Sequence, residues 1–197
     1  MPVTIEFFYD FRSPYSYLAF TQLRQLGAEI DFKPMKVLAL MEKVGNVPTT
    51  LTCEAKGAYA RIDLGRWAQR YAVAINPSDM KANDGAAMAR AVIAAAPEQR
   101  DAVTLALYRA IWSEGRTLGN SAAVLAELSD AGIDTAKIAE RIDAAETAAQ
   151  LDRFTEEAAA RGVFGSPTMI VGDAMFFGND RIEFLREEIA RLEGRHD

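Results

Sequence analysis

The strand-forming segments of this chain lie only near its two ends, and that distribution constrains the fold more than any other feature. Residues 3–8 and 29–34 carry strand patterns on either side of a helical pattern at 14–26, so the chain begins strand, helix, strand. After Gly165 the strand signal returns as TMIVG and AMFFG around a Gly-Asp turn, which predicts a hairpin followed by a helix over about 181–192. The two ends are therefore expected to share one sheet.

The segment between these ends, from Val37 to about Gly162, shows helical rather than strand periodicity. Proline and glycine residues separate the individual helical patterns. We expect helices at 55–71, 84–95, 98–113, 121–131, 135–145 and 147–161. A helical block inserted between two halves of one sheet is the layout of a thioredoxin-like α/β fold.

Composition limits the classes of partner. The chain has 197 residues, which suggests one domain with an insertion, and its net charge of −6 would repel nucleic acid and anionic membranes. No apolar run approaches the ~20 residues that span a bilayer, and the first residues lack the pattern of a signal peptide. We therefore expect a cytoplasmic protein with no nucleic-acid or membrane partner.

Two residue types are almost missing, and their scarcity restricts the chemistry. Cys53 and His196 are the single cysteine and the single histidine of the sequence. One cysteine cannot form an internal disulfide, and one histidine near the C-terminus makes a zinc site or a catalytic triad implausible. We expect no bound metal, and any nucleophile is expected to be unusual or to arrive with a cofactor.

The turn between the first strand and the first helix has the sequence YDFRSPYSYLAF. Thioredoxin-type oxidoreductases carry a Cys-x-x-Cys motif at such a corner, and this chain has Ser13-Pro14-Tyr15-Ser16 instead. Ser13 as N-cap and Pro14 as first helical residue have a complete structural explanation. Alternatively, the Ser13 hydroxyl donates to an anion, such as a thiolate, held at the positive end of the helix.

A second motif, GSPT at 165–168, places Pro167 directly before a predicted strand. Proline is common at a strand's first residue and needs no functional explanation there. A cis Ser166-Pro167 bond is the informative alternative, because it would turn the Ser166 backbone toward the first helix.

Several further polar residues have ordinary structural explanations. Asn179 and Asp180 are predicted to form an N-cap cluster before the last helix, and Asn46 is predicted to be a turn residue. Lys56, Tyr59, Asp63 and Arg66 recur at helical spacing, which is typical of a solvated or ion-paired face. Cys53 is interpreted as a bystander thiol.

Together, however, five motifs resemble one family over nearly the whole chain. FYDFRSPYSY, GNVP at 45–48, the K-x-x-Y-x-x-x-D-x-x-R pattern of 56–66, VFGSPT at 163–168 and FGNDR at 177–181 resemble the 2-hydroxychromene-2-carboxylate isomerases and the related kappa-class glutathione transferases. The resemblance implies a DsbA-like thioredoxin fold, a homodimer and glutathione as cofactor. It also implies a thioredoxin-like domain formed by residues 1–36 and 163–197, with a helical insertion domain at 37–162.

The resemblance also implies roles for individual residues. Ser13 is the catalytic residue, since it would hydrogen-bond the glutathione sulfur, and Pro14, Tyr15 and Pro167 flank the cofactor. The Ser166 backbone would contact the glutathione cysteinyl backbone, although many relatives have a larger aliphatic residue there. Asn179 and Asp180 would hold the γ-glutamyl end, and Asn46 would make an additional contact. Thr49 stands where many relatives have proline, so no role is transferred to residues 49–55.

The reaction implied is interconversion of 2-hydroxychromene-2-carboxylate and trans-o-hydroxybenzylidenepyruvate, a step of aromatic catabolism on a small aromatic carboxylate. A kappa-like transferase or peroxidase and a non-catalytic thioredoxin-fold binding module remain as alternatives. Arg12 and Lys43 are candidates for binding the substrate carboxylate. A possible aromatic wall, equally well explained as core, consists of Phe11, Tyr15, Phe164, Phe176 and Phe177.

Overall fold

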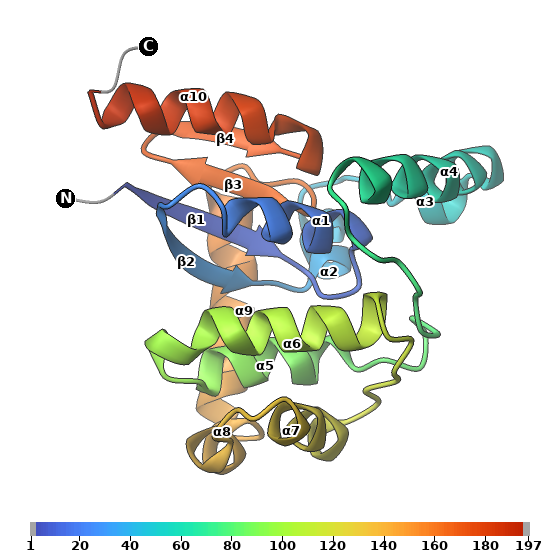
Figure 1. Ribbon diagram of the computed structural model, residues 1–197, viewed down its shortest axis with the longest axis vertical. Helices are drawn as coiled ribbons and strands as arrows, with labels where there is room; N and C mark the ends of the chain where they lie inside the picture. Colours follow the sequence, from blue (N-terminus) through green and yellow to red (C-terminus); the bar gives the residue numbers. More distant parts are fainter. Residues whose placement is uncertain (1–2, 195–197) are drawn as a thin grey trace.

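One four-stranded sheet joins the two ends of the chain in the computed structural model, which describes residues 3–194. The strands are β1 (Thr4–Tyr9), β2 (Glu29–Pro34), β3 (Thr168–Val171) and β4 (Ala174–Phe177), in the order β2-β1-β3-β4. β1 pairs in parallel with β2 and antiparallel with β3, and β3 and β4 form the expected hairpin (Figure 1). The prediction that both ends share one sheet is confirmed.

The other regular elements of the described chain are helices. They are α1 (Pro14–Leu23), α2 (Val37–Lys43), α3 (Thr49–Thr52), α4 (Glu54–Arg70), α5 (Gly85–Ala94), η1 (Pro97–Gln99), α6 (Arg100–Trp112), α7 (Ser121–Asp130), α8 (Ala136–Arg141), α9 (Ala145–Ala160), η2 (Asn179–Arg181) and α10 (Ile182–Leu192). No helix among residues 3–194 is long and apolar enough to cross a membrane. The order of elements is that of a thioredoxin-like fold with a large helical insertion.

Both faces of β1 are buried toward its C-terminal end, which explains the consecutive aromatic residues Phe7, Phe8 and Tyr9 in its sequence TIEFFY. Phe7 and Tyr9 point to one face, where they join the large core cluster with Phe20 of α1. Phe8 points to the other face and packs with Leu40 of α2 and Ala158 of α9. Because successive strand side chains alternate between faces, one strand serves both layers. Burying each of these phenylalanines contributes about 1.5–3 kcal/mol.

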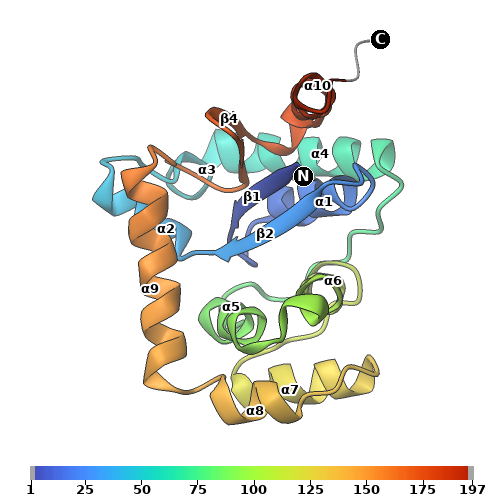
Figure 2. The same ribbon diagram turned by 90° about the vertical axis from the view of Figure 1, so that its left-hand side faces the viewer.

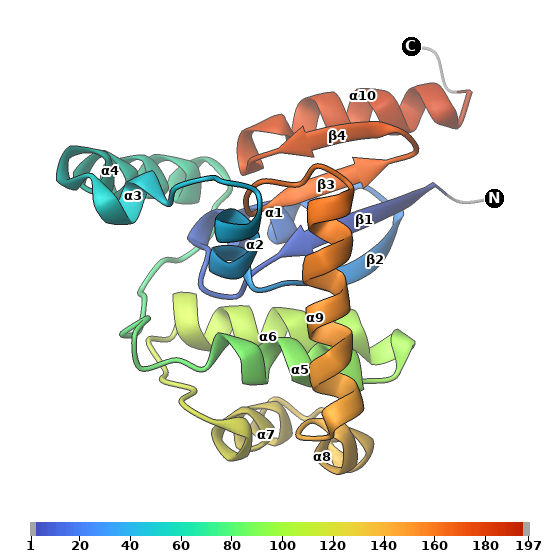
Figure 3. The same ribbon diagram turned by 180° about the vertical axis from the view of Figure 1, so that it is seen from behind.

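The helical insertion is arranged in layers beside the sheet. α5 and α6 lie next to the sheet and to α1. A further layer beyond them consists of α7 and α8. α9 runs along the side of the molecule from α8 back to the sheet (Figures 2 and 3). α3 and α4 project away from the sheet, and Ala68 is the one buried residue of α4 (Figure 1). This arm adjoins the N-terminus of α1.

The predicted C-terminal end of the helix at 135–145 was wrong. α8 stops at Arg141, and Ala144 is extended before α9 begins at Ala145. The side chain of Arg90 explains the break, because it donates to the Ile142 carbonyl oxygen at 2.9 Å and to Asp143 at 3.2 Å. These tertiary bonds engage backbone and side-chain groups in the segment between the helices.

The boundaries of the two proposed domains, 1–36 with 163–197 and 37–162, stay a prediction.

Candidate functional site

Ser13 lies where β1 turns into α1, and both local predictions for it are confirmed. It is the N-cap of α1 with extended backbone, its Oγ accepts from the Ser16 N–H at 3.2 Å, and Pro14 follows as the first helical residue. The Ser13 N–H donates to the Asp10 carbonyl oxygen at 3.0 Å, which closes the turn. The first-turn amides and the helix dipole make this end of α1 favourable for negative charge.

The backbone of Ser166 faces this cap from the other end of the sequence. The Ser166-Pro167 peptide bond is cis, as expected. The Ser13 hydroxyl donates to the Ser166 carbonyl oxygen at 3.3 Å. The structure therefore brings together Ser13, Pro14, Ser166 and Pro167, which come from opposite ends of the chain.

Two residues that sequence reasoning missed support this junction from below. Ser16 is fully buried, and its Oγ lies 2.6 Å from the Ser166 Oγ. The Asp10 N–H also donates to the Ser166 Oγ, at 3.0 Å. The nearly buried Asp10 carboxylate accepts from the Arg12 and Val37 N–H groups at 2.9 and 3.1 Å. Ser-x-x-Ser within a helix start was the available signal, but only the fold shows its partner.

Asn179 and Asp180 do not cap the last helix, so that prediction was wrong. They form the short 3-10 helix η2, and α10 begins after Arg181 without a side-chain cap. The reason is that the Asp180 carboxylate pairs with the Arg181 guanidinium at 2.5 Å instead of reaching the α10 amides. Gly178 has φ of +100°, and a Cβ there would lie 2.5 Å from Asp180 Oδ1. Only glycine leaves room for this carboxylate.

Asn179 presents an unusual buried amide. Its side chain is 4% exposed, and its Nδ2 has no hydrogen-bond partner among the described residues. The main-chain carbonyl oxygen of Asn179 accepts from the Tyr71 hydroxyl at 2.7 Å, which joins η2 to the end of α4. An unpaired buried donor of this kind costs about 1–3 kcal/mol, so a polar ligand that accepts from it would be favoured.

Asn46 connects a loop of the insertion to the segment before Ser166. Asn46 follows the turn at Val44 and Gly45, and its Oδ1 accepts from the Val47 N–H at 2.8 Å. Its Nδ2 donates to the Phe164 carbonyl oxygen at 2.7 Å. The side chain is thus already committed to protein groups on both of its polar atoms.

Tyr15 links α1 to the projecting helix α4. Its hydroxyl donates to Asp63 Oδ2 at 3.1 Å and to the Ala60 carbonyl oxygen at 3.3 Å. Burial and the neighbouring Asp63 carboxylate raise the pKa of Tyr15 above the usual value of a tyrosine. Tyr15 therefore remains a neutral hydrogen-bond donor at physiological pH.

A hollow of about 370 Å³ lies on this side of Tyr15, between α3 and α4. It is lined by Tyr15, Thr50, Ala55, Lys56, Tyr59 and Ala60. The helical spacing of Lys56 and Tyr59 in the sequence predicts a solvated face and does not indicate a hollow. Lys56 forms no ion pair with any described residue, whereas Arg12 pairs with Asp10 and Lys43 with Glu156. Among the described residues that line the hollow, Lys56 is therefore the cation without a carboxylate partner.

The aromatic wall considered from sequence is not formed as one surface. Phe11 is 1% exposed and belongs to the core, and Phe176 packs against the same core. Phe164 and Phe177 are half-exposed, with ring centroids 4.6 Å apart. These two rings flank the segment that carries Ser166 and Pro167.

Comparison with known proteins supports the fold and shows the family. Residues 4–190 match the family model described as a DSBA-like thioredoxin domain. The chain is 31% identical to a Sphingobium xenophagum protein named 2-hydroxychromene-2-carboxylate isomerase, with 94% of this chain and 97% of that protein covered. It is 28% identical to human glutathione S-transferase kappa 1, over 94% and 90% of the two chains. A solved 2-hydroxychromene-2-carboxylate isomerase superposes with a TM-score of 0.84 at 29% identity, over 96% and 95%.

Proposed function

This chain belongs to the DsbA-like thioredoxin-domain family and, within it, to the 2-hydroxychromene-2-carboxylate isomerase family, and on that basis we propose that it is a glutathione-dependent isomerase. The proposed reaction interconverts 2-hydroxychromene-2-carboxylate and trans-o-hydroxybenzylidenepyruvate. The observation that carries the proposal is the placement of a serine hydroxyl, a cis-proline backbone and the positive end of α1 at one point.

The residues at this point fit glutathione. The Ser166 backbone offers polar groups for a peptide-like cofactor beside Pro167. Asp180 would provide a carboxylate for an ammonium group, because Arg181 engages its Oδ2 and leaves Oδ1 available. The unpaired Asn179 Nδ2 provides a donor for the γ-glutamyl carboxylate. A named kappa-class glutathione transferase among the relatives supports the same assignment.

Bound glutathione would supply a thiol nucleophile that adds reversibly to the electron-poor alkene, so that rotation about the resulting single bond changes its geometry. The Ser13 hydroxyl would turn from the Ser166 carbonyl oxygen toward the sulfur and stabilise its negative charge. The Ser16 N–H that now bonds Ser13 Oγ would keep the hydroxyl in position. The helix dipole of α1 would add to this stabilisation.

The hollow beside Tyr15 is the proposed site of the flat substrate. Its volume of about 370 Å³ falls at the small end of the range for ligand pockets. Tyr15 and Tyr59 present ring surfaces there, and Lys56 is the unpaired cation for the substrate carboxylate. Lys56 replaces Arg12 and Lys43 in this role, because those two cations already have carboxylate partners.

Two properties of the working enzyme complete the proposal. Glutathione is held mainly in the reducing cytoplasm, where we place the protein. A homodimer is supported by large apolar side chains exposed on the α3–α4 arm, including Leu51 and Ile62, which are 73% and 59% exposed. Sedimentation equilibrium tests the dimer, and a monomer at micromolar concentration contradicts it.

The decisive experiment assays isomerisation with glutathione, with S-methylglutathione and without either. We expect turnover with glutathione alone, because the methylated cofactor keeps its recognition groups but lacks the nucleophilic thiol. Rapid conjugation of aryl halides without isomerisation would favour the kappa-like transferase instead. Binding of glutathione with no reaction on either substrate class would leave a binding module.

A further inference from the structure

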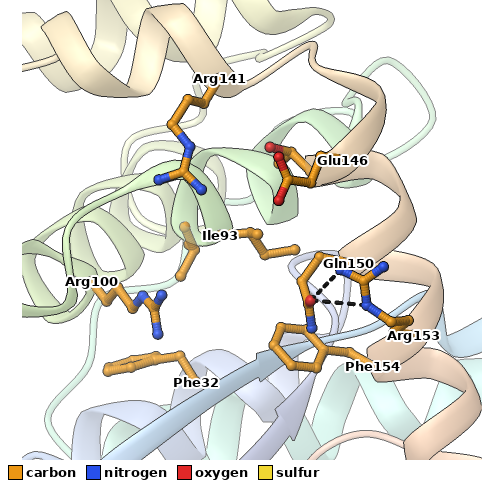
Figure 4. A pocket seen from close by; sticks show the side chains of 10 residues that line it. Phe32, Ile93, Arg100, Arg141, Glu146, Gln150, Arg153 and Phe154 are labelled. Carbon is orange, nitrogen blue, oxygen red and sulfur yellow. Dashed lines mark hydrogen bonds between the residues drawn. The ribbon is translucent and has the colours of Figure 1, made fainter.

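A second cavity lies on the other side of the molecule, where the helical insertion meets the edge strand β2. Its volume is about 290 Å³, and its lining comes from β2, α5, α6, α8 and α9 (Figure 4). None of the residues proposed to bind glutathione or substrate contributes to it. It is therefore separate from the site around Ser13.

The charge of the lining is strongly positive for a protein of net charge −6. Arg100, Arg141 and Arg153 line the cavity from three different helices, and Glu146 is the carboxylate among the lining residues. In Figure 4 Arg141 and Glu146 lie above the cavity and Arg100 lies at its left near Phe32, while Arg153 lies at its right edge against Gln150. Three cations around one carboxylate leave an excess of two positive charges.

None of these three guanidinium groups has a carboxylate partner among residues 3–194, and Arg153 is the one of the three that a neutral side chain holds. Among residues 3–194, neither Arg100 nor Arg141 forms an ion pair, and Arg100 Nε is buried with no hydrogen-bond partner. Arg153 differs, since its Nε and Nη2 donate to Gln150 Oε1 at 3.0 and 2.6 Å and so fix its orientation. Because buried polar groups in proteins are nearly always paired, the unpaired Arg100 Nε indicates a missing acceptor.

The remaining lining is apolar and partly aromatic. Phe32 and Phe154 lie along the lower side of the cavity in Figure 4, and Ile93 faces them from above. Arginine planes and phenylalanine faces together suit a flat ring that carries an acidic group. A cavity of about 150 Å³ holds a single benzene ring, so about 290 Å³ accommodates a two-ring molecule.

We propose that this cavity binds a small aromatic carboxylate, with Arg100 and Arg141 pairing its carboxylate and with Phe32 and Phe154 contacting its ring. Binding here requires no glutathione and no turnover. The proposal is therefore independent of the reaction assigned to the Ser13 site.

The test is a heteronuclear NMR titration of the whole protein with 2-naphthoate. We expect shifts of the Thr147, Gln150 and Phe154 amides and at least tenfold weaker binding in Arg100→Gln and Arg141→Gln. Arg186→Gln, an exposed arginine on α10 with the same charge change, should bind within twofold of wild type. Arg141 is exposed, so its variant keeps the test valid even if Arg100→Gln fails to fold.

Two further ligands examine the chemistry. The neutral isostere 2-naphthamide should bind at least tenfold more weakly than 2-naphthoate, because it lacks the charge that the arginines recognise. Inorganic phosphate should displace 2-naphthoate only at concentrations at least tenfold above it. Equal binding of the amide, equal displacement by phosphate, unchanged affinity in both arginine variants, or shifts confined to Ser13 and Ser166 would overturn the proposal.

Discussion

The hydroxyl oxygens of Ser16 and Ser166 lie 2.6 Å apart although 150 positions separate them in the sequence. This pair fastens the first turn of α1 to the segment that carries the cis-proline. Ser166 also accepts the Asp10 N–H, so one hydroxyl serves both the β1–α1 turn and the helix. The geometry around Ser13 therefore depends on Ser166. Its side chain bonds other residues of the protein, and its main chain is proposed to contact glutathione.

Ser166→Ala is expected to lower stability by about 1–3 kcal/mol, because the Asp10 N–H and the buried Ser16 hydroxyl lose their partner. Glutathione affinity should change little, since the proposed contact uses the main chain. Urea unfolding and calorimetric titration measure the two effects. Ser129→Ala, at an exposed position on α7, is the control and should be close to neutral. A stability unchanged in Ser166→Ala would contradict the supporting role.

Ser13→Ala tests whether Ser13 does more than cap the helix. Loss of the cap alone should cost about 1 kcal/mol of stability. Loss of the hydroxyl that stabilises the thiolate should also raise the pKa of bound glutathione toward its reference value of about 8.5 and reduce turnover strongly. Ultraviolet titration of the thiolate measures this change.

Ser13→Asp is the matched variant for that experiment. Aspartate keeps a good N-cap but places a carboxylate against the thiolate, so this protein should fold well and be inactive. If wild type and both variants titrate alike and activity follows stability alone, Ser13 is only a cap.

Asp180→Ala is expected to weaken glutathione binding by about 1.5–3 kcal/mol, the range for a hydrogen bond to a charged group. The fold should be unaffected, because the Asp180–Arg181 pair is exposed and such pairs contribute little. Isothermal titration calorimetry gives the affinity. Asp173→Ala in the β3–β4 turn removes an equal charge at another exposed position and should bind as wild type. Equal affinities of the two variants would refute the assignment.

Lys56→Gln should raise KM for the chromene carboxylate about tenfold and change kcat little. The proposed hydrogen bond from the Lys56 ammonium to the substrate carboxylate is worth about 1.5 kcal/mol or more, which corresponds to about tenfold in affinity. Steady-state kinetics at saturating glutathione separates the two constants. Lys137→Gln, an exposed lysine on α8, is the charge control. An unchanged KM would place the substrate carboxylate elsewhere.

The burial of Tyr9 leads us to expect that the folded protein loses stability at alkaline pH. Burial raises the pKa of this fully buried tyrosine, whereas an unfolded tyrosine ionises near pH 10. The folded state thus holds the proton more tightly, so the stabilisation is complete below about pH 10 and falls by about 1.4 kcal/mol per pH unit above it. The fall in Tm between pH 9 and pH 11 should be smaller in Tyr9→Phe than in wild type. Tyr59→Phe, at an exposed position, should show the wild-type fall.

Local sequence predicted the elements of this fold well, because they depend on patterns within a few neighbours. The alternation of faces in β1, the Ser13-Pro14 start of α1 and the Gly-Asp hairpin turn are all set by backbone preferences at adjacent positions. The end of α8 was misplaced for the complementary reason. It is decided by Arg90, a side chain that is distant in sequence and reaches the Ile142 carbonyl oxygen only in the folded chain.

The candidate site shows the same division. Sequence alone placed Ser13 at the positive end of a helix and Pro167 at the start of a strand, since capping and proline geometry are local. Only the tertiary structure decided that Ser16 and Asp10 would meet Ser166, that Asp180 would pair with Arg181 rather than cap α10, and that Lys56 would be the unpaired cation beside Tyr15. A hydroxyl or a charge has several partners of similar energy, and the choice among them depends on which groups packing brings within about 3 Å.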